Sequence, residues 1–217
     1  MVSLKNVFLV LASAASAATA AAIGRRDVQA CSSGKSPNCF CPLGTTLQQS
    51  TARCRIRAAA DDVIAIIGSY HNTSWFGRTP DYVNGTDNEI GGSRTLTGHT
   101  LEGDAQFTET LFEYSDNKKG GFTMAYEMEN GPVSYIDPDT GETGYYAGYW
   151  DYLETKALGS KLTQFDWRIY ACFTPAELAG MEFFHGWALA NVNAILMEQG
   201  LSTGMAQAPF TIESFHT

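Results

Sequence analysis

The chain has 217 residues, of which 44% are hydrophobic, and a formal net charge of −9 at pH 7. Roughly 200 residues suffice for one domain with a sizeable core. An acidic chain repels phosphate backbones, so we expect no nucleic-acid partner.

The first 22 residues have the pattern of a cleaved secretory signal peptide. Lys5 gives a short basic start, an apolar core follows, and the alanine-rich stretch through Ala22 offers A-x-A cleavage sites. The apolar run is short and rich in alanine, which makes a membrane anchor the weaker alternative. No later segment has about 18 consecutive apolar residues, so we expect a secreted protein without stable membrane insertion.

A cysteine-containing N-terminal arm is expected over residues 23–43, which show no periodicity. Arg25 and Arg26 resemble a dibasic processing site, and two solvated arginines are the alternative. Cleavage after Arg26 would leave 191 residues. It would also remove three basic residues and no acid, which changes the net charge from −9 to −12.

Four of the five cysteines cluster near the mature N-terminus: Cys31, Cys39, Cys41 and Cys54. In an oxidising compartment this cluster predicts disulfides, with three possible connectivities. A metal site is the weaker alternative because no histidine lies near the cluster. Cys172 lies far away in the sequence and is either a buried free thiol or the replacement for one of the four.

Two acceptor motifs predict N-glycosylation in one glycine- and asparagine-rich loop. They are Asn72-Thr73-Ser74 and Asn84-Gly85-Thr86.

The first elements are a strand over residues 44–58 and a short helix over residues 59–70, where Asp61 and Asp62 precede an apolar run. Strands follow over residues 92–98, 106–115 and 144–155. Two more strands show period-two alternation. Their inward residues are Phe122, Met124, Tyr126 and Met128 in one, and Phe165, Trp167, Ile169, Ala171 and Phe173 in the other.

A long amphipathic helix follows these strands. Thr174-Pro175-Ala176-Glu177 is typical of a helix start, and Gly200 of a helix end. One apolar arc holds Leu178, Met181, Phe184, His185, Ala188, Leu189, Val192, Ile195 and Leu196. We expect a C-terminal tail over residues 201–217. One antiparallel sheet with a long helix across it is an α+β fold, and the space between the two layers is a natural ligand cavity.

Several segments, in this order, resemble the START/Bet v 1-like (SRPBCC) superfamily, in particular its polyketide cyclase/dehydrase-like members. They are residues 56–63, Trp75, residues 92–96, residues 109–116, Trp167 and the C-terminal helix. The resemblance covers roughly residues 45–200. It implies a helix-grip fold over residues 44–200, in which a bent antiparallel sheet of about seven strands surrounds the C-terminal helix and an apolar cavity. Relatives bind lipids, steroids, polyketides and hormones, and some catalyse cyclisation or dehydration.

Three ionisable side chains are the candidate catalytic residues. The resemblance implies that Glu109 faces the cavity, where burial would raise the pKa of its carboxyl and suit it to acid or base work. The alternative is a strand glutamate paired with Arg94. His185 lies in the apolar arc and suits proton transfer, or is a satisfied core histidine. Tyr126 needs a hydroxyl partner in the ligand or the protein.

The ligand-binding candidates include Arg94, which could orient an anionic ligand group. The others would line the cavity: Trp75, Phe122, Met124, Met128, Trp167, Phe184 and Leu189.

The leading hypothesis is a secreted, cofactor-independent cyclase or related proton-transfer enzyme for a polyketide-like or aromatic molecule. The alternatives are a non-catalytic lipid or steroid carrier and a secreted effector that acts on proteins. We expect neither a metal nor a cofactor, and the oligomeric state stays open.

Overall fold

The computed structural model describes residues 41, 45–100, 103–117, 121–129, 131–136, 141, 143–173 and 178–216. The expected signal peptide, the dibasic pair, Cys31, Cys39 and the expected helix start at residues 174–177 lie outside this part of the chain.

The described chain folds as one antiparallel sheet with two α-helices, which confirms the α+β helix-grip class. The elements are β1 (Thr46–Ile56), α1 (Ala60–Ile67), the 3-10 helix η2 (Ser74–Phe76), β2 (Tyr82–Asn84), β3 (Ser93–Thr100), β4 (Gly103–Asp116), β5 (Gly121–Met128), β6 (Val133–Ile136), β7 (Thr143–Gly159), β8 (Leu162–Phe173), α2 (Leu178–Glu198) and β9 (Met205–His216). The strand order is β2-β3-β4-β5-β7-β8-β1-β9, and β6 pairs with β7.

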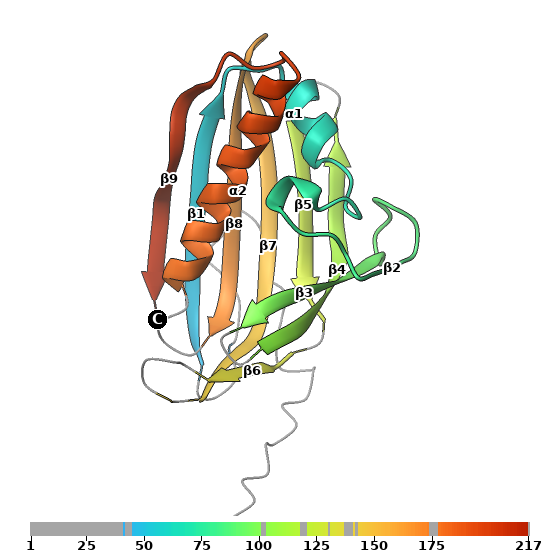
Figure 1. Ribbon diagram of the computed structural model, residues 1–217, viewed down its shortest axis with the longest axis vertical. Helices are drawn as coiled ribbons and strands as arrows, with labels where there is room; N and C mark the ends of the chain where they lie inside the picture. The colour runs from blue at the N-terminus through green and yellow to red at the C-terminus, as the bar shows by residue number, and fades with distance from the viewer. Residues whose placement is uncertain are drawn as a thin grey trace, which may run out of the picture.

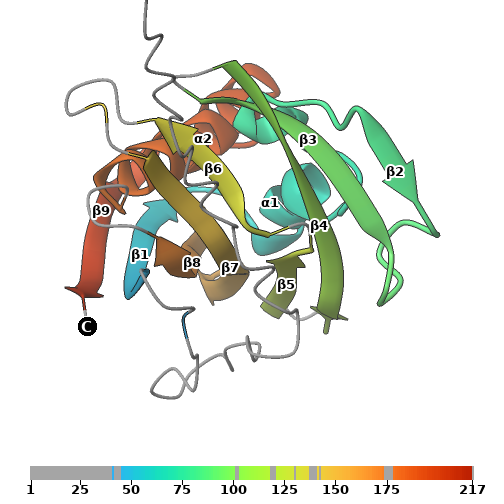
Figure 2. The same cartoon turned by 90° about the horizontal axis from the view of Figure 1, so that it is seen from below.

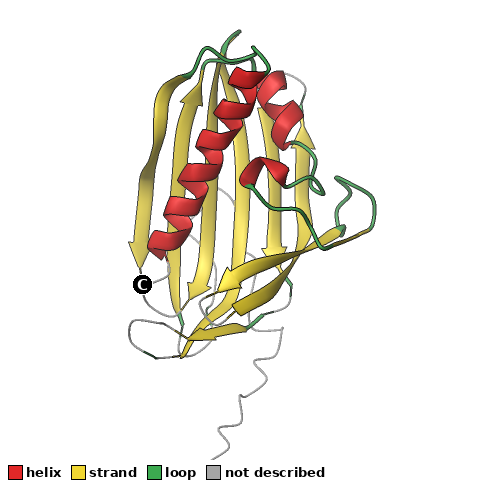
Figure 3. Ribbon diagram, in the orientation of Figure 1, coloured by secondary structure: helices red, strands yellow, loops and turns green. Residues whose placement is uncertain are grey.

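Both α-helices lie against the same face of the sheet, which we call the inner face (Figures 1 and 3). The alternation predicted for β5 and β8 is confirmed, because Phe122, Met124 and Trp167 are buried in the core between the sheet and the helices. Their strand neighbours point to the opposite, outer face. The main core therefore lies between the inner face and α2.

The predicted apolar arc of α2 is also confirmed, with Ala188, Leu189 and Val192 fully buried. The helix ends at Glu198, two residues before the predicted Gly200, whose φ of 71° is left-handed. The Leu201 amide donates to the Leu196 carbonyl over 2.8 Å and the Gly200 amide to the Met197 carbonyl over 3.0 Å, which is a Schellman motif. No described helix has the length and apolarity needed to span a bilayer.

The predicted C-terminal tail over residues 201–217 was wrong for most of its length. Met205–His216 forms β9, which pairs antiparallel with β1 from Gln48 to Ile56 and covers the edge of β1. In the described part of the chain the sheet has nine strands, against the about seven that the family resemblance implied. The six strands predicted individually are all present, and β2, β6 and β9 are additional.

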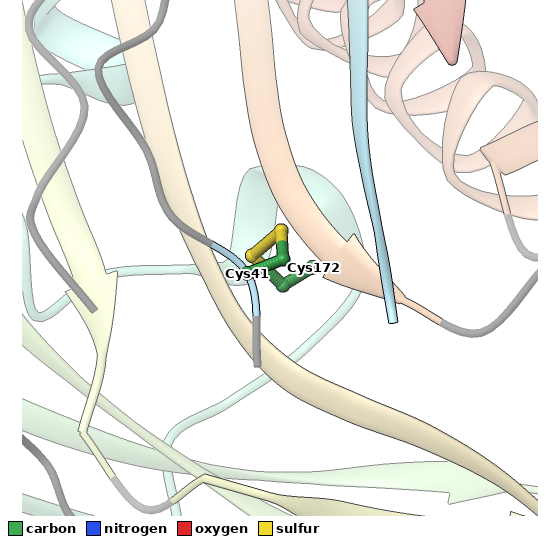
Figure 4. Close-up of a disulfide and its surroundings, with 2 residues drawn as sticks. All are labelled: Cys41 and Cys172. Carbon is green, nitrogen blue, oxygen red and sulfur yellow. A yellow bond between two sulfur atoms is a disulfide. The ribbon is translucent and has the colours of Figure 1, made fainter. Parts of the chain in front are cut away.

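The prediction of disulfides among the four N-terminal cysteines needs correction. Cys41 pairs with Cys172 in β8 (Figure 4), and Cys54 is a buried free thiol on the inner face of β1. Cys172 thus replaces one of the four, an alternative that the sequence left open. The bridge joins positions that are 131 residues apart, so only the folded chain brings them together.

Deleting residues 205–217 tests the role of β9. We expect the free energy of unfolding to fall by more than ~3 kcal/mol, because several ladder hydrogen bonds worth ~1 kcal/mol each are lost. The exposed edge of β1 should also promote association. Urea unfolding and size-exclusion chromatography measure both effects. Ile212→Thr, at a partly exposed β9 position, should cost less than ~1 kcal/mol. An unchanged urea midpoint in the deletion variant would contradict the assignment.

Candidate functional site

A cavity of about 200 Å³ lies between the inner face of the sheet and the N-terminal half of α2. Its lining comes from η2 and the loop after it, β3, β4, β5, β7, β8 and α2. The lining residues are Phe76, Arg78, Leu96, Thr97, Gly98, Phe107, Glu109, Tyr126, Tyr146, Tyr149, Asp151, Trp167, Met181, Phe184 and His185. Seven of these 15 residues are phenylalanine, tyrosine or tryptophan, and the lining also contains two carboxyls, Glu109 and Asp151.

A buried ion pair supports that wall. Arg94 on β3 faces Glu109 on β4 across the register, and both are at most 5% exposed. The Arg94 Nε donates to Glu109 Oε2 over 2.6 Å, and its Nη1 donates to the Tyr70 carbonyl over 2.6 Å. The rings of Tyr70 and Tyr126 flank the guanidinium, each with its centroid 4.4 Å away. These contacts replace the water that two buried charges lose.

Glu109 also has a second partner on the cavity side. The Tyr149 hydroxyl on β7 donates to Glu109 Oε1 over 2.7 Å. Burial and the Glu109 carboxylate raise the pKa of Tyr149 well above its ordinary value, so this tyrosine stays protonated. The hydroxyl oxygen of Tyr149 keeps lone pairs for a ligand donor, while Glu109 fixes its orientation.

A second polar group, Asp151 on β7, lies in the same wall. The Trp167 indole donates to Asp151 Oδ1 over 2.8 Å, and His185 Nε2 lies 3.8 Å from the same oxygen. The imidazole of His185 stacks on the Trp167 ring with centroids 4.0 Å apart. Its Nδ1 is buried and has no hydrogen-bond partner among the described residues.

Burial determines the charge state of this pair. Desolvation, followed by repulsion from Glu109, raises the pKa of Asp151 well above its ordinary value of 3.8. Desolvation lowers the pKa of His185 to about 3. No arginine or lysine donates directly to Asp151 among the described contacts, so burial favours the protonated carboxyl and the neutral imidazole. Both shifts act in the direction of an uncharged acid beside an uncharged base.

The structure brings the three predicted catalytic residues together. Glu109, His185 and Tyr126 all line the cavity. Arg94 is not among the lining residues and binds Glu109, which is the alternative that the sequence analysis left open for both residues.

Of the predicted ligand-binding residues, Trp167 and Phe184 line the cavity. The others pack in the main core and are not among the residues that line this cavity, so a ligand role for them stays a prediction: Trp75, Phe122, Met124, Met128 and Leu189. Trp75 supports the cavity wall indirectly. The centroid of its ring lies 5.1 Å from that of Trp167, and its backbone carbonyl accepts a hydrogen bond from the side-chain amide of Asn191 on α2.

Asp151 and Tyr149 also line the cavity and were not predicted from the sequence. A signal was present, because Asp151 stands in an aromatic run between Trp150 and Tyr152. An acid surrounded by aromatic residues in a strand favours a buried carboxyl with a partner.

Asn72 and Asn84 are both exposed, and glycosylation at them stays a prediction. No group of three or more metal-binding side chains occurs within the described ranges.

Comparison with solved structures places the fold among known ones. A major latex-like protein from Panax ginseng matches with a TM-score of 0.51 and 9% identity, over 69% of this chain and 97% of that one. A protein from Nitrosospira multiformis matches with a TM-score of 0.49 and 21% identity, over 67% and 94% of the two chains. Norcoclaurine synthase from Thalictrum flavum matches with a TM-score of 0.48 and 14% identity, over 72% and 90%.

Among proteins with curated descriptions, none matches this sequence. The sequence model of the START domain matches residues 48–216, which includes every cavity-lining residue as well as β9. This match extends past the boundary at residue 200 that the sequence analysis expected. The chain therefore belongs to the START domain family, with a START/Bet v 1-like fold.

Proposed function

We propose that the protein binds a small aromatic or polyketide-like molecule in the inner cavity and transfers protons on it without a cofactor, as a cyclase or a related enzyme would. One observation carries this proposal. A buried carboxyl and a buried imidazole, Asp151 and His185, lie 3.8 Å apart in the wall of the cavity, where desolvation favours the uncharged form of each. Such a pair supplies both a proton donor and a proton acceptor near neutral pH.

The size of the cavity supports a small ligand. An apolar cavity of ~150 Å³ holds one benzene molecule, so about 200 Å³ fits a ligand of one or two rings. Steroids and acyl chains need more room, because typical ligand pockets have roughly 300–1,000 Å³. The volume therefore favours a compact aromatic substrate over the lipid or steroid of the carrier hypothesis.

The proton transfer follows from the resting charge state. Asp151 gives its proton to a carbonyl oxygen of the ligand, while the His185 imidazole removes a proton from the adjacent carbon, which yields the enol. The pair becomes a carboxylate and an imidazolium whose Oδ1 and Nε2 lie 3.8 Å apart. Their attraction at these buried positions offsets the low basicity of the resting imidazole. The enol carbon can then attack a second carbonyl of the same molecule and close a ring. In that step the enol hydroxyl returns its proton to the Asp151 carboxylate as its C=O bond re-forms, and the His185 imidazolium protonates the oxygen of the attacked carbonyl, which restores the neutral pair.

The other polar groups orient the ligand in this scheme. Glu109, paired with Arg94, holds the Tyr149 hydroxyl so that its oxygen can accept a hydrogen bond from a phenol or an enol. Tyr126 supports the same arrangement by stacking on Arg94 and forming part of the wall. These positioning roles replace direct proton transfer by Glu109 and Tyr126.

The proposal includes export from the cell. The Cys41–Cys172 disulfide supports it, because such bonds persist in oxidising compartments. The signal-like first 22 residues and the exposed Asn72 and Asn84 acceptors are consistent with the same route.

The second candidate is a non-catalytic carrier. Native mass spectrometry of the secreted protein distinguishes the two, because a carrier releases its ligand unchanged. A steroid or acyl lipid that co-purifies and is released unaltered would favour the carrier.

Hydrogen exchange on phenylacetone tests the catalytic pair without knowledge of the natural substrate. We expect the protein to accelerate deuterium incorporation at the carbon between ring and carbonyl in D₂O, followed by NMR. Asp151→Asn and His185→Ala should each lower the protein-dependent rate ~100-fold or more, since each removes one proton-transfer group.

Glu113→Gln is the matched control, because Glu113 is a β4 carboxylate outside the cavity lining and should leave exchange unchanged. Equal exchange rates in wild type, Asp151→Asn and His185→Ala would contradict the proposed roles.

The neutral pair also predicts opposite pH effects on stability. His185 has a lowered folded pKa, so its contribution should be lost as the pH falls from about 6.5 towards about 3, by up to ~1.4 kcal/mol per pH unit. Asp151 has a raised folded pKa, so its contribution should be lost as the pH rises above 3.8.

Urea unfolding between pH 4 and pH 8 measures both effects. His185→Gln should flatten the acid side of the stability profile, and Asp151→Asn should flatten the loss at higher pH. Profiles of both variants that run parallel to wild type would show that the two groups titrate normally in the folded protein.

A further inference from the structure

The lining of the inner cavity contains a cation that the proposed proton transfer does not use. Arg78, in the loop after η2, is the only arginine or lysine among the described residues that line the cavity. It is partly buried, and its guanidinium has no hydrogen bond or ion pair to any described residue. A guanidinium carries a positive charge and several N–H donors in a planar fork, so this side chain can bind an anionic group of a ligand.

The backbone of Arg78 is fixed although its side chain has no partner in the described chain. The Thr73 hydroxyl donates to the Arg78 carbonyl over 2.8 Å, and the Arg78 amide donates to the Thr73 carbonyl over 3.4 Å. The preceding Gly77 has a left-handed φ of 74°, and a Cβ added to it would lie 2.7 Å from the ring of Trp187 on α2. The segment of η2 and Gly77 is thus held beside α2 (Figure 1), and the base of the Arg78 side chain has a defined position.

The acid nearest to Arg78 in the sequence has a different partner. Asp81 accepts a hydrogen bond from the Thr97 hydroxyl on β3 over 2.6 Å, and it forms no ion pair with Arg78 in the part of the chain that the structure describes. Seen from below, the sheet curves around both α-helices, with β2 and β3 at one end of the curve (Figure 2). Thr97 and Gly98 of β3 and Arg78 thereby belong to one lining. The guanidinium is therefore available to a ligand in the cavity.

We infer that the ligand of this cavity carries one carboxylate, which pairs with Arg78 while Asp151 and His185 act on a carbonyl of the same molecule. The substrate class is then an aromatic keto acid of one or two rings. The keto group in this inference rests on the proposed function. The carboxylate does not, because Arg78 would bind it in a carrier as well.

The charges of the lining favour a carboxylate over a phosphate. A planar carboxylate matches the guanidinium fork with two parallel hydrogen bonds. A phosphate group has roughly two negative charges at neutral pH, whereas the described lining offers one arginine and also contains Glu109, whose charge is already paired with Arg94. The second charge of a phosphate would have no cation opposite it, which is costly away from water.

Binding of phenylacetate and phenylacetamide tests the carboxylate site without any proton transfer. The two probes have nearly the same shape, and only phenylacetate is charged. By isothermal titration calorimetry at pH 7, the wild type should bind phenylacetate ~10-fold or more tightly than phenylacetamide, because hydrogen bonds to charged groups are the stronger ones. Phenyl phosphate should bind more weakly than phenylacetate.

Arg78→Gln should remove the preference for phenylacetate over phenylacetamide. Its midpoint of urea unfolding should stay at the wild-type value, because the guanidinium has no described partner to lose. Arg78→Lys should keep part of the preference, since it retains the charge without the planar fork. Arg55→Gln is the matched control, because Arg55 is exposed on β1 outside the described lining and its replacement changes the net charge equally. This control should bind both probes as the wild type does.

Phenylpyruvate links the carboxylate to the proposed reaction, because it is phenylacetone with a carboxylate in place of the methyl group. The KM for protein-dependent deuterium exchange should be ~10-fold or more lower for phenylpyruvate than for phenylacetone, and Arg78→Gln should bring the two KM values together.

The two sets of measurements separate the inference from the proposed function. A preference for phenylacetate that is lost in Arg78→Gln, without exchange on either ketone, would support the carboxylate site and count against the proposed proton transfer. Equal affinity of the wild type for phenylacetate and phenylacetamide would overturn the carboxylate site, even if phenylacetone exchanges. An unchanged preference in Arg78→Gln, or tighter binding of phenyl phosphate than of phenylacetate, would overturn it as well.

Discussion

The buried ion pair of Arg94 and Glu109 is the constraint on which the inner cavity depends. Removing two charges from water costs several kcal/mol for each ion, so the protein must surround both with partners. Arg94 has a carboxylate, a backbone carbonyl and two aromatic rings, and Glu109 has a guanidinium and a tyrosine hydroxyl. Because these partners come from β3, β4, β5, β7 and the loop after α1, the pair fixes the wall of the cavity.

The same constraint separates the two buried carboxyls. Glu109 has a cation as its partner, whereas Asp151 has a neutral indole and a neutral imidazole. The charge on Glu109 further disfavours ionisation of Asp151. Two carboxyls on neighbouring parts of one wall thus lie in different electrostatic environments, which is the usual arrangement where one acid moves protons and another fixes geometry.

Backbone periodicity explains which parts the sequence could predict. Strand alternation correctly placed Tyr126 and Trp167 on the inner face, and helical periodicity placed His185. Asp151 was not predicted as a site residue, because β7 has an irregular register between Tyr146 and Tyr149 that breaks a simple alternation of inward and outward side chains along the strand. The Cys41–Cys172 pairing and the docking of β9 depend on contacts between distant segments, which local patterns do not encode. The size of the cavity likewise follows only from packing.

The central claim is that Asp151 and His185 are an uncharged pair in the resting protein. NMR observation of the Asp151 carboxyl carbon and the His185 ring nitrogens during a pH titration tests it most directly. At pH 6 the account predicts a protonated carboxyl and a neutral imidazole, with no imidazolium until the pH approaches about 3. An ionised Asp151 beside an imidazolium at pH 6 would contradict it.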